Sequence, residues 1–144
     1  MPRRLPGLLT VALLFFASPV AAQAPASQVR NQLDTARDAL RDQGLRPSHS
    51  YRLDRLREEG EDTVSVGLTA TRSYAIVGAC DTDCADLDFW LYDENDNLID
   101  SDTGTDAVPV VRVTPRWSGT FSLRVRMAAC AVEPCAYGIG VFGD

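Results

Sequence analysis

Residues 86–97, DLDFWLYDENDN, decide the fold class of this chain. In the first seven positions, Leu87, Phe89 and Leu91 alternate with acidic or aromatic side chains. A period of two is typical of a β-strand with one face in a hydrophobic core. The last five positions are Asp, Glu and Asn, and both Asp and Asn tolerate the left-handed backbone of a tight turn. The stretch therefore predicts a strand that runs into a hairpin turn at 93–97.

The same alternation recurs on both sides of this stretch. Several short strands separated by turn-forming residues are typical of an antiparallel sandwich or barrel. We therefore predict an all-β domain of about eight strands over residues 48–144. The other alternating runs are 51–54, 64–68, 74–78, 108–113, 121–127 and 137–141.

One segment near the N-terminus has a period close to four. Between Ser27 and about Leu45, a narrow apolar stripe is surrounded by charged residues, which predicts an amphipathic helix. A helix this polar is marginal alone, so we expect its stripe to lie on the β domain or on a partner. The stripe consists of Val29, Leu33, Ala36 and Leu40, with Ser27 as the expected cap, Gly44 as the end and Pro47 as the stop.

The first 22 residues have the pattern of a secretory leader. Arg3 and Arg4 precede an apolar run at 8–17, and small residues at 20–22 fit a signal peptidase. We expect a Sec-type signal peptide cleaved after Ala22, and a mature protein in the periplasm or secreted. Residues 23–47 would then form a tether and the helix.

The net charge of the chain is negative, which limits the kinds of partner it can bind. The chain has fourteen basic residues, all arginine, against twenty acidic residues, a net charge of −6. Without residues 1–22, twelve arginines face twenty acids, and the net charge becomes about −8. An acidic domain is a poor ligand for nucleic acid. No further apolar stretch reaches membrane-spanning length, so we expect no transmembrane segment in the mature chain.

Four cysteines, Cys80, Cys84, Cys130 and Cys135, lie in the predicted domain. An even number in a small exported domain predicts two disulfides. Of the three pairings, we favour Cys80–Cys84 and Cys130–Cys135, because each pair brackets a short loop between predicted strands. A four-thiolate zinc site is the alternative.

Half of the acidic residues lie within 81–106, where no arginine occurs. Calcium takes six to eight oxygen ligands, so an irregular calcium site would explain this concentration of charge. The spacing is not that of an EF-hand. The predicted ligands lie in the loop between the first two cysteines and on the strand after it, namely Asp81, Asp83, Asp86 and Asp88.

The alternative to calcium is that these acids are solvated or form turns. Asp86 and Asp88 would then pair across strands with Arg124 and Arg126.

Trp90 and Tyr92 share the strand face opposite to Leu87, Phe89 and Leu91. If the aliphatic face enters the core, the two aromatic rings lie on the outside of a sheet. They would form a platform for a sugar or a peptide, or they would be covered by the stripe of the N-terminal helix. We favour the second interpretation.

The sequence does not indicate an enzyme. His49 is the one histidine, and no nucleophile-elbow or zinc-binding helix motif is present. Asp86 and Asp88 would lie roughly 7 Å apart along a strand, but nothing in the sequence builds a cleft around them.

Residues 64–142 resemble the bacterial pre-peptidase C-terminal domain family, whose fold is similar to that of clostridial collagen-binding domains. The resemblance implies a jelly-roll-like antiparallel β-sandwich, with calcium in some members. No peptidase accompanies the match, and the cysteines and helix are additions to the pattern, so we expect a stand-alone exported member. The matching segments are 73–78, 86–93, 117–125 and 137–139.

These features predict an exported, non-enzymatic binding module for a protein, peptide or glycan, with calcium as a candidate stabilising ion. The alternative is a structural or partner subunit of an envelope assembly that docks through the helix.

Overall fold

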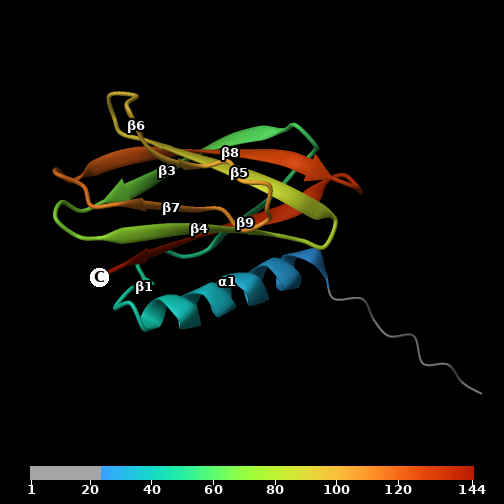
Figure 1. Ribbon diagram of the computed structural model, residues 1–144, viewed down its shortest axis with the longest axis horizontal. Helices are drawn as coiled ribbons and strands as arrows, with labels where there is room; N and C mark the ends of the chain where they lie inside the picture. Colours follow the sequence, from blue (N-terminus) through green and yellow to red (C-terminus); the bar gives the residue numbers. More distant parts are fainter. Residues whose placement is uncertain (1–23) are drawn as a thin grey trace, which may run out of the picture.

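The computed structural model describes residues 24–144, so the predicted leader lies outside the described residues. Nine strands form two antiparallel sheets that face each other, and one helix covers the lower sheet (Figure 1). The predicted all-β sandwich with an N-terminal helix is confirmed. The elements are α1 (Pro25–Arg41), β1 (Arg46–Pro47), β2 (Arg52–Leu56), β3 (Glu61–Leu68), β4 (Tyr74–Cys80), β5 (Cys84–Tyr92), β6 (Leu98–Asp102), β7 (Val110–Val113), β8 (Gly119–Cys130) and β9 (Cys135–Gly143).

The order of the strands is that of a jelly roll. One sheet runs β2-β9-β4-β7, with β1 extending the line of β2 along β9, and the other runs β3-β8-β5-β6. The pairs β2–β9, β3–β8, β4–β7 and β5–β6 are all antiparallel, so the chain folds like one long hairpin wrapped into two layers. β6 and β7 lie at the edges of their sheets on the same side of the sandwich.

Strand β5 buries the face that its alternation predicts. Leu87, Phe89 and Leu91 have no exposed surface, whereas Trp90 and Tyr92 are half-buried. The hairpin turn at 93–97 is also confirmed, because the buried Asp93 carboxylate accepts hydrogen bonds from the amides of Asn95 (2.8 Å) and Asn97 (2.9 Å).

The cysteines form the two local disulfides, which confirms the favoured pairing and leaves no free thiolate for zinc among residues 24–144. Cys80–Cys84 joins the end of β4 to the start of β5, and Cys130–Cys135 joins β8 to β9. Each bridge therefore connects one sheet to the other. Cys84 lies opposite Cys130 in the register of β5 and β8, so both bridges close the same end of the sandwich.

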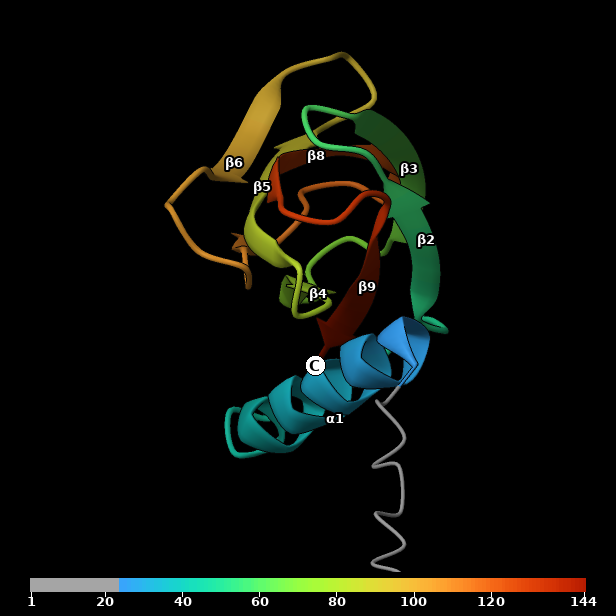
Figure 2. The same ribbon diagram turned by 90° about the vertical axis from the view of Figure 1, so that its right-hand side faces the viewer.

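Helix α1 lies on the outer face of the sheet that contains β4 and β9 (Figures 1 and 2). Its stripe is buried there: Val29 and Leu33 pack with Ala79 and Ala136, and Leu40 packs in a second cluster around Phe142. Both faces of β4 and β9 are consequently covered, which is why every residue of the two strands is buried.

The ends of the helix differ in part from the prediction. The helix begins at Pro25 rather than Ser27, because proline is favoured in the first helical turn, and the Ser27 hydroxyl donates to the carbonyl of Ala24 instead of capping. The helix ends at Arg41 with Asp42 as its C-cap, so Gly44, the predicted end, lies in the turn that follows, with a φ of 79° that favours glycine. β1 falls within the segment assigned to tether and helix, and it pairs with β9.

The two long sides of the sandwich are held by aspartates. On one side, Asp62 of β3 accepts hydrogen bonds from the Tyr137 hydroxyl (2.8 Å) and from Arg52 (3.1 Å), so it connects the two sheets. On the other side, Asp100 and Asp102 of β6 accept the amides of Arg112 (2.8 Å) and Val110 (2.9 Å) in β7. β6 therefore satisfies the outward amides of β7 with side chains rather than with a strand ladder.

Candidate functional site

The loop between Cys80 and Cys84 is fastened to the fold by Asp81. Its buried carboxylate accepts the amide of Asp83 (3.1 Å) through Oδ1 and the amide of Ala136 (2.7 Å) through Oδ2. Both oxygens thus bond to the backbone. The chemistry of Asp81 is that of a structural turn residue.

Asp86 and Asp88 lie further along, on β5. In each, Oδ1 is buried and has no hydrogen-bond partner among residues 24–144. Burial raises the pKa of both carboxyl groups; repulsion from Asp106 adds to the effect at Asp86, and repulsion from Asp86 adds to it at Asp88. The positive charge of Arg126 lowers the pKa of both groups, but less than burial raises it.

The structure does not assemble the predicted calcium ligands. Among residues 24–144, no three His, Cys, Asp or Glu side chains are grouped so that they could hold a metal ion. Calcium binding therefore gains no support from the geometry of Asp81, Asp83, Asp86 and Asp88.

The predicted ion pairs between β5 and β8 are right in one case and wrong in the other. Asp88 lies opposite Arg126, with 3.9 Å between Oδ2 and Nη1. Asp86 does not pair with Arg124, because the antiparallel register that places Asp88 opposite Arg126 places Trp90 opposite Arg124; Asp86 lies opposite Ala129.

Trp90 and Tyr92 lie on the outer face of the β3-β8-β5-β6 sheet, and the favoured idea that the helix covers them is wrong. The apolar stripe of α1 finds its complementary surface on the other sheet, against the small side chains of β4 and β9. The Arg124 guanidinium lies 4.3 Å from the centre of the Trp90 ring. A ligand that stacked on that face of the indole would have to displace Arg124.

A cleft of about 320 Å³ opens where β6 begins and β7 ends, at the side of the sandwich away from β2 and β3. Two of its residues are large, apolar and well exposed: Trp117 by 40% and Ile99 by 39%. Phe121, by contrast, is buried in the core, and Val113 packs against that core. The residues that line the cleft are Ile99, Val113, Thr114, Pro115, Arg116, Trp117 and Phe121.

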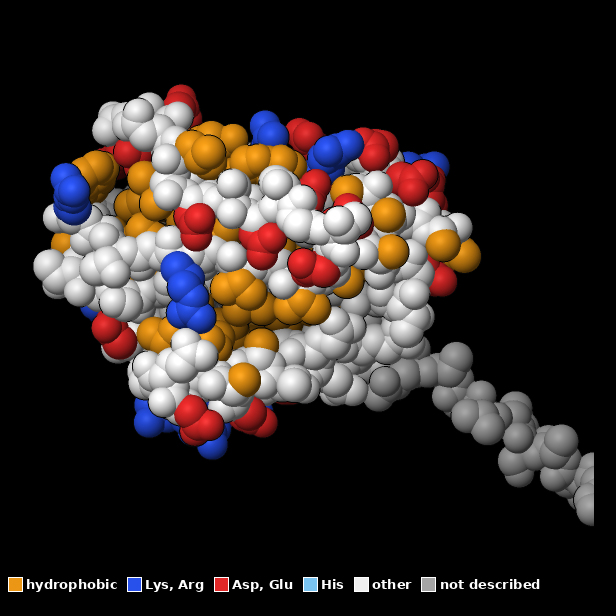
Figure 3. All heavy atoms as spheres, viewed as in Figure 1, with side chains coloured by type: hydrophobic (Ala, Val, Ile, Leu, Met, Phe, Trp, Pro, Cys, Tyr) orange, Lys and Arg blue, Asp and Glu red, His pale blue; other side chains and the backbone are white. Residues whose placement is uncertain are grey.

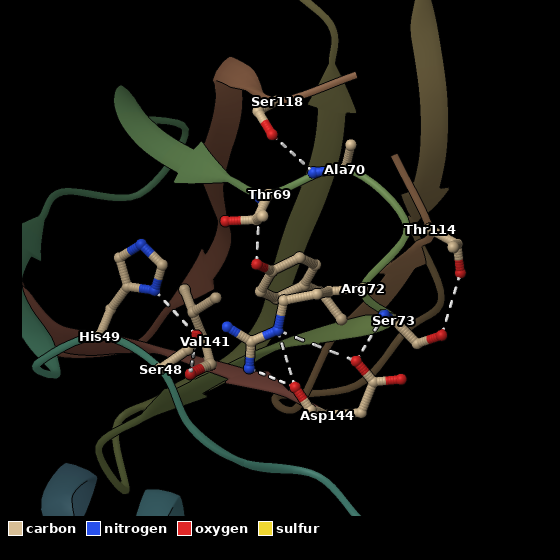
Figure 4. Close-up of polar contacts among 11 residues, drawn as sticks. Ser48, His49, Thr69, Ala70, Arg72, Ser73, Thr114, Ser118, Val141 and Asp144 are labelled. Atoms are coloured by element: carbon tan, nitrogen blue, oxygen red, sulfur yellow. Dashed lines mark hydrogen bonds and ion pairs between the residues drawn. The ribbon is translucent and has the colours of Figure 1, made fainter. Parts of the chain in front are cut away.

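The loop that carries Trp117 is held by hydrogen bonds to the β3–β4 connection. Ser118 Oγ accepts the amide of Ala70 (2.8 Å), and the Pro115 carbonyl accepts the amide of Thr71 (2.8 Å). Figure 4 shows the Ser118 contact, together with the pair of hydroxyls of Ser73 and Thr114, which lie 3.2 Å apart. These bonds fix the wall of the cleft before any ligand arrives.

A second, more polar hollow of about 520 Å³ lies on the other side of the end of β7 and shares Val113 and Thr114 with the cleft. Arg112 lines it and donates to Gln43 Oε1 (3.2 Å). Figure 3 shows exposed hydrophobic side chains on the face that carries β7, separated by charged groups.

His49 forms a serine–histidine contact, but its geometry is not that of an activated nucleophile. Ser48 Oγ lies 2.9 Å from His49 Nδ1, and it also donates to the Val141 carbonyl at 3.1 Å (Figure 4). Among residues 24–144, no carboxylate is bonded to the His49 ring to orient it.

The cleft was missed in the sequence because its residues lie in separate elements. Trp117 lies two residues after Pro115 and directly before a Ser-Gly pair, which indicates a loop. Ile99 is the second residue of a short edge strand. The available signals were the apolar pair at 98–99 within the acidic segment 81–106, and a tryptophan in a turn. Only the approach of β6 and β7, at the adjacent edges of the two sheets, places them together.

No family model and no curated protein matches this chain. The resemblance to pre-peptidase C-terminal domains therefore stays a prediction.

Proposed function

We propose that this protein is a binding module that receives an apolar side chain of a protein or peptide partner in the cleft beside Trp117. The observation that carries the proposal is the exposure of Trp117 and Ile99 on two walls of one hollow. Exposed apolar groups that line a concave surface are typical of interaction sites. An indole in a fixed pocket is also a frequent centre of binding energy.

The same surface continues along the edge of the sandwich. Leu98 is 54% exposed and precedes Ile99 in β6, and Val108 is 45% exposed just before β7. A partner segment that lay along β6 and β7 would cover these side chains as well as the cleft. This supports a protein or peptide ligand more than a small molecule.

Export is part of the proposal. All four cysteines are paired in buried disulfides, which persist in oxidising compartments. Within residues 24–144, no helix has the length and apolar character needed to cross a membrane. The proposed location is the periplasm or the outside of the cell.

Docking through the helix has less support as a role. The side chains that would bind an envelope partner, Val29, Leu33 and Leu40, are buried against the protein's own sheet. A partner would have to pull α1 away from β4 and β9.

The proposal is tested by selecting a displayed library of random twelve-residue peptides on the immobilised protein. We expect the enriched peptides to bind wild type and to lose at least about tenfold in affinity on Trp117→Ala, the size of a modest hot spot. Ile99→Ser should weaken the same peptides.

Val132→Ser is the matched control. Val132 is 64% exposed but lies in the loop between Cys130 and Cys135, outside the cleft. It should leave the affinity unchanged. Selected peptides that bound the Trp117 and Ile99 variants as tightly as wild type, with folding verified by circular dichroism, would overturn the proposal.

A further inference from the structure

The charge around the cleft is mainly negative. Besides the buried Asp93, five acidic residues lie between β5 and β7, and none of the five forms an ion pair within residues 24–144. Three of them accept backbone amides, which satisfies hydrogen bonds but leaves the net charge in place. The five are Glu94, Asp96, Asp100, Asp102 and Asp106.

Two of these acids adjoin the apolar walls. A Cβ atom on Gly119 would lie 3.1 Å from Glu94 Oε2, so the Glu94 carboxylate lies beside the turn that follows Trp117. Asp100 follows Ile99 in β6, and its Oδ2 accepts the amide of Arg112. The apolar cleft therefore has negative charge next to both exposed side chains.

Two arginines near the cleft carry positive charge that offsets part of this negative charge. Arg116 lines the cleft, and Arg112 lies across the end of β7, where it donates to Gln43. Asp106 lies away from the cleft, since its carbonyl accepts the amide of Leu87 near the other end of β5. The remaining four carboxylates outnumber the two cations. Within the acidic segment 81–106, the one ion pair among described residues joins Asp88 of β5 to Arg126, at 3.9 Å. The surface that flanks the cleft thus keeps an excess of negative charge.

We propose that the partner segment is cationic: an apolar side chain enters the cleft, and lysine or arginine side chains beside it face the carboxylates of β6 and its flanking loops. This inference rests on the proposed function and specifies its ligand. Complementary charge would raise the association rate and select against acidic partners. Because most of these carboxylates are exposed or half-buried, the effect should be screened by salt.

The test uses three fluorescein-labelled peptides that share a central Phe-Leu pair, flanked by lysines, by glutamines or by glutamates. Fluorescence anisotropy with the full mature chain should give a dissociation constant at least about tenfold lower for the lysine peptide than for the glutamate peptide at 20 mM salt. The preference should shrink to about twofold or less at 500 mM salt, where the screening length falls to a few ångströms.

A charge-matched pair of variants locates the effect. Glu94→Gln with Asp96→Asn should weaken the lysine peptide several-fold and leave the glutamine peptide unchanged. Asp38→Asn with Asp42→Asn removes the same charge from exposed positions in α1 and directly after it, and should change neither affinity. A loss from the helix variant equal to that from the loop variant would contradict a local role for the acids.

The peptide measurements test the cationic preference and the proposed binding at the cleft separately. If all three peptides bind equally and each is weakened by Trp117→Ala, the cleft binds apolar segments and the cationic preference is wrong. Tighter binding of the glutamate peptide would also overturn it and would make Arg116 the selecting charge. If Trp117→Ala weakens none of the peptides, the proposed function fails as well.

Discussion

Asp86 lies in an environment that disfavours its charge. Its Oδ1 is buried without a partner, and both burial and the nearby Asp106 raise its pKa. A carboxyl group with a raised pKa in the folded state lowers stability at neutral pH. The penalty is removed as the pH falls through the folded pKa and the group takes up a proton.

We therefore expect Asp86→Asn to raise the free energy of unfolding at pH 7 by up to about 1 kcal/mol. The gain should shrink as the pH is lowered, because wild type then protonates Asp86. Denaturation at a series of pH values measures both effects. Asp96→Asn is the control, because it removes an exposed charge from the same segment at a left-handed position that asparagine tolerates. It should raise the free energy of unfolding by less. An equal gain would mean that general charge repulsion, and not the burial of Asp86, causes the effect.

For single residues, the sequence predicts which face of the sheet a side chain occupies better than it predicts its neighbour on the next strand. The alternation in β5 places Leu87 in the core and Trp90 outside, and the structure agrees. The predicted pairs of Asp86 with Arg124 and of Asp88 with Arg126 exclude each other in antiparallel strands: with Asp88 opposite Arg126, it is Trp90 that lies opposite Arg124. A pattern of period two fixes the face of a side chain but not its neighbour across the strand.

At the level of elements, the contact between α1 and β9 depends on a glycine in β9. A Cβ on Gly138 would lie 2.5 Å from Val29 Cγ1 and 2.7 Å from Leu53 Cδ2. These atoms belong to the buried packing of the helix, so they have little room to move. Gly138 therefore sets how closely the helix approaches the sheet.

We expect Gly138→Ala to lower the free energy of unfolding by about 1–3 kcal/mol, the usual cost of overpacking, and to loosen α1. Limited proteolysis with trypsin after Arg41, where the helix ends, should accelerate. Gly67→Ala is the matched control, because a Cβ there meets no atom within 4 Å. Equal proteolysis of wild type and Gly138→Ala would contradict the packing described for this helix.

The two disulfides should contribute similarly, because they close loops of similar length at one end of the sandwich. Replacing Cys80 and Cys84 together by alanine should cost about 2 kcal/mol of stability from loop closure alone. Replacing Cys130 and Cys135 should cost about the same. Chemical denaturation of the two double variants measures the costs, and a loss below about 0.5 kcal/mol in either would contradict a stabilising role for that bridge.

The helix illustrates what element-level patterns leave undetermined. Its stripe indicated that it must dock, and it does, but not on the aromatic face. The target was present in the sequence as two nearly unbroken runs of apolar and small residues, YAIVGAC at 74–80 and CAYGIGVFG at 135–143. Such runs are typical of strands that are covered on both faces.

For the whole molecule, the fold class followed from periodicity, whereas the candidate cleft did not. Alternating runs and turns suffice to predict a sandwich, because each strand must bury one face. The cleft requires knowing that β6 and β7, which belong to different sheets, share one open side of the jelly roll. That information lies in the long-range pairing, so Trp117 was visible in the sequence without a role.

The central claim is that the ligand enters the cleft and not the aromatic face of β5. The chain has two tryptophans, one at each place: Trp117 in the cleft and Trp90 on the sheet. Their two indole N–H signals in a proton–nitrogen correlation spectrum therefore report on the two surfaces separately. Trp90→Phe assigns the pair.

The measurement is a titration of the nitrogen-15-labelled mature chain with a peptide selected on it. We predict that the Trp117 indole signal shifts in a saturable manner while the Trp90 signal stays in place. Movement of the Trp90 signal with a fixed Trp117 signal would contradict the account and would move the binding surface to the outer face of β5 and β8.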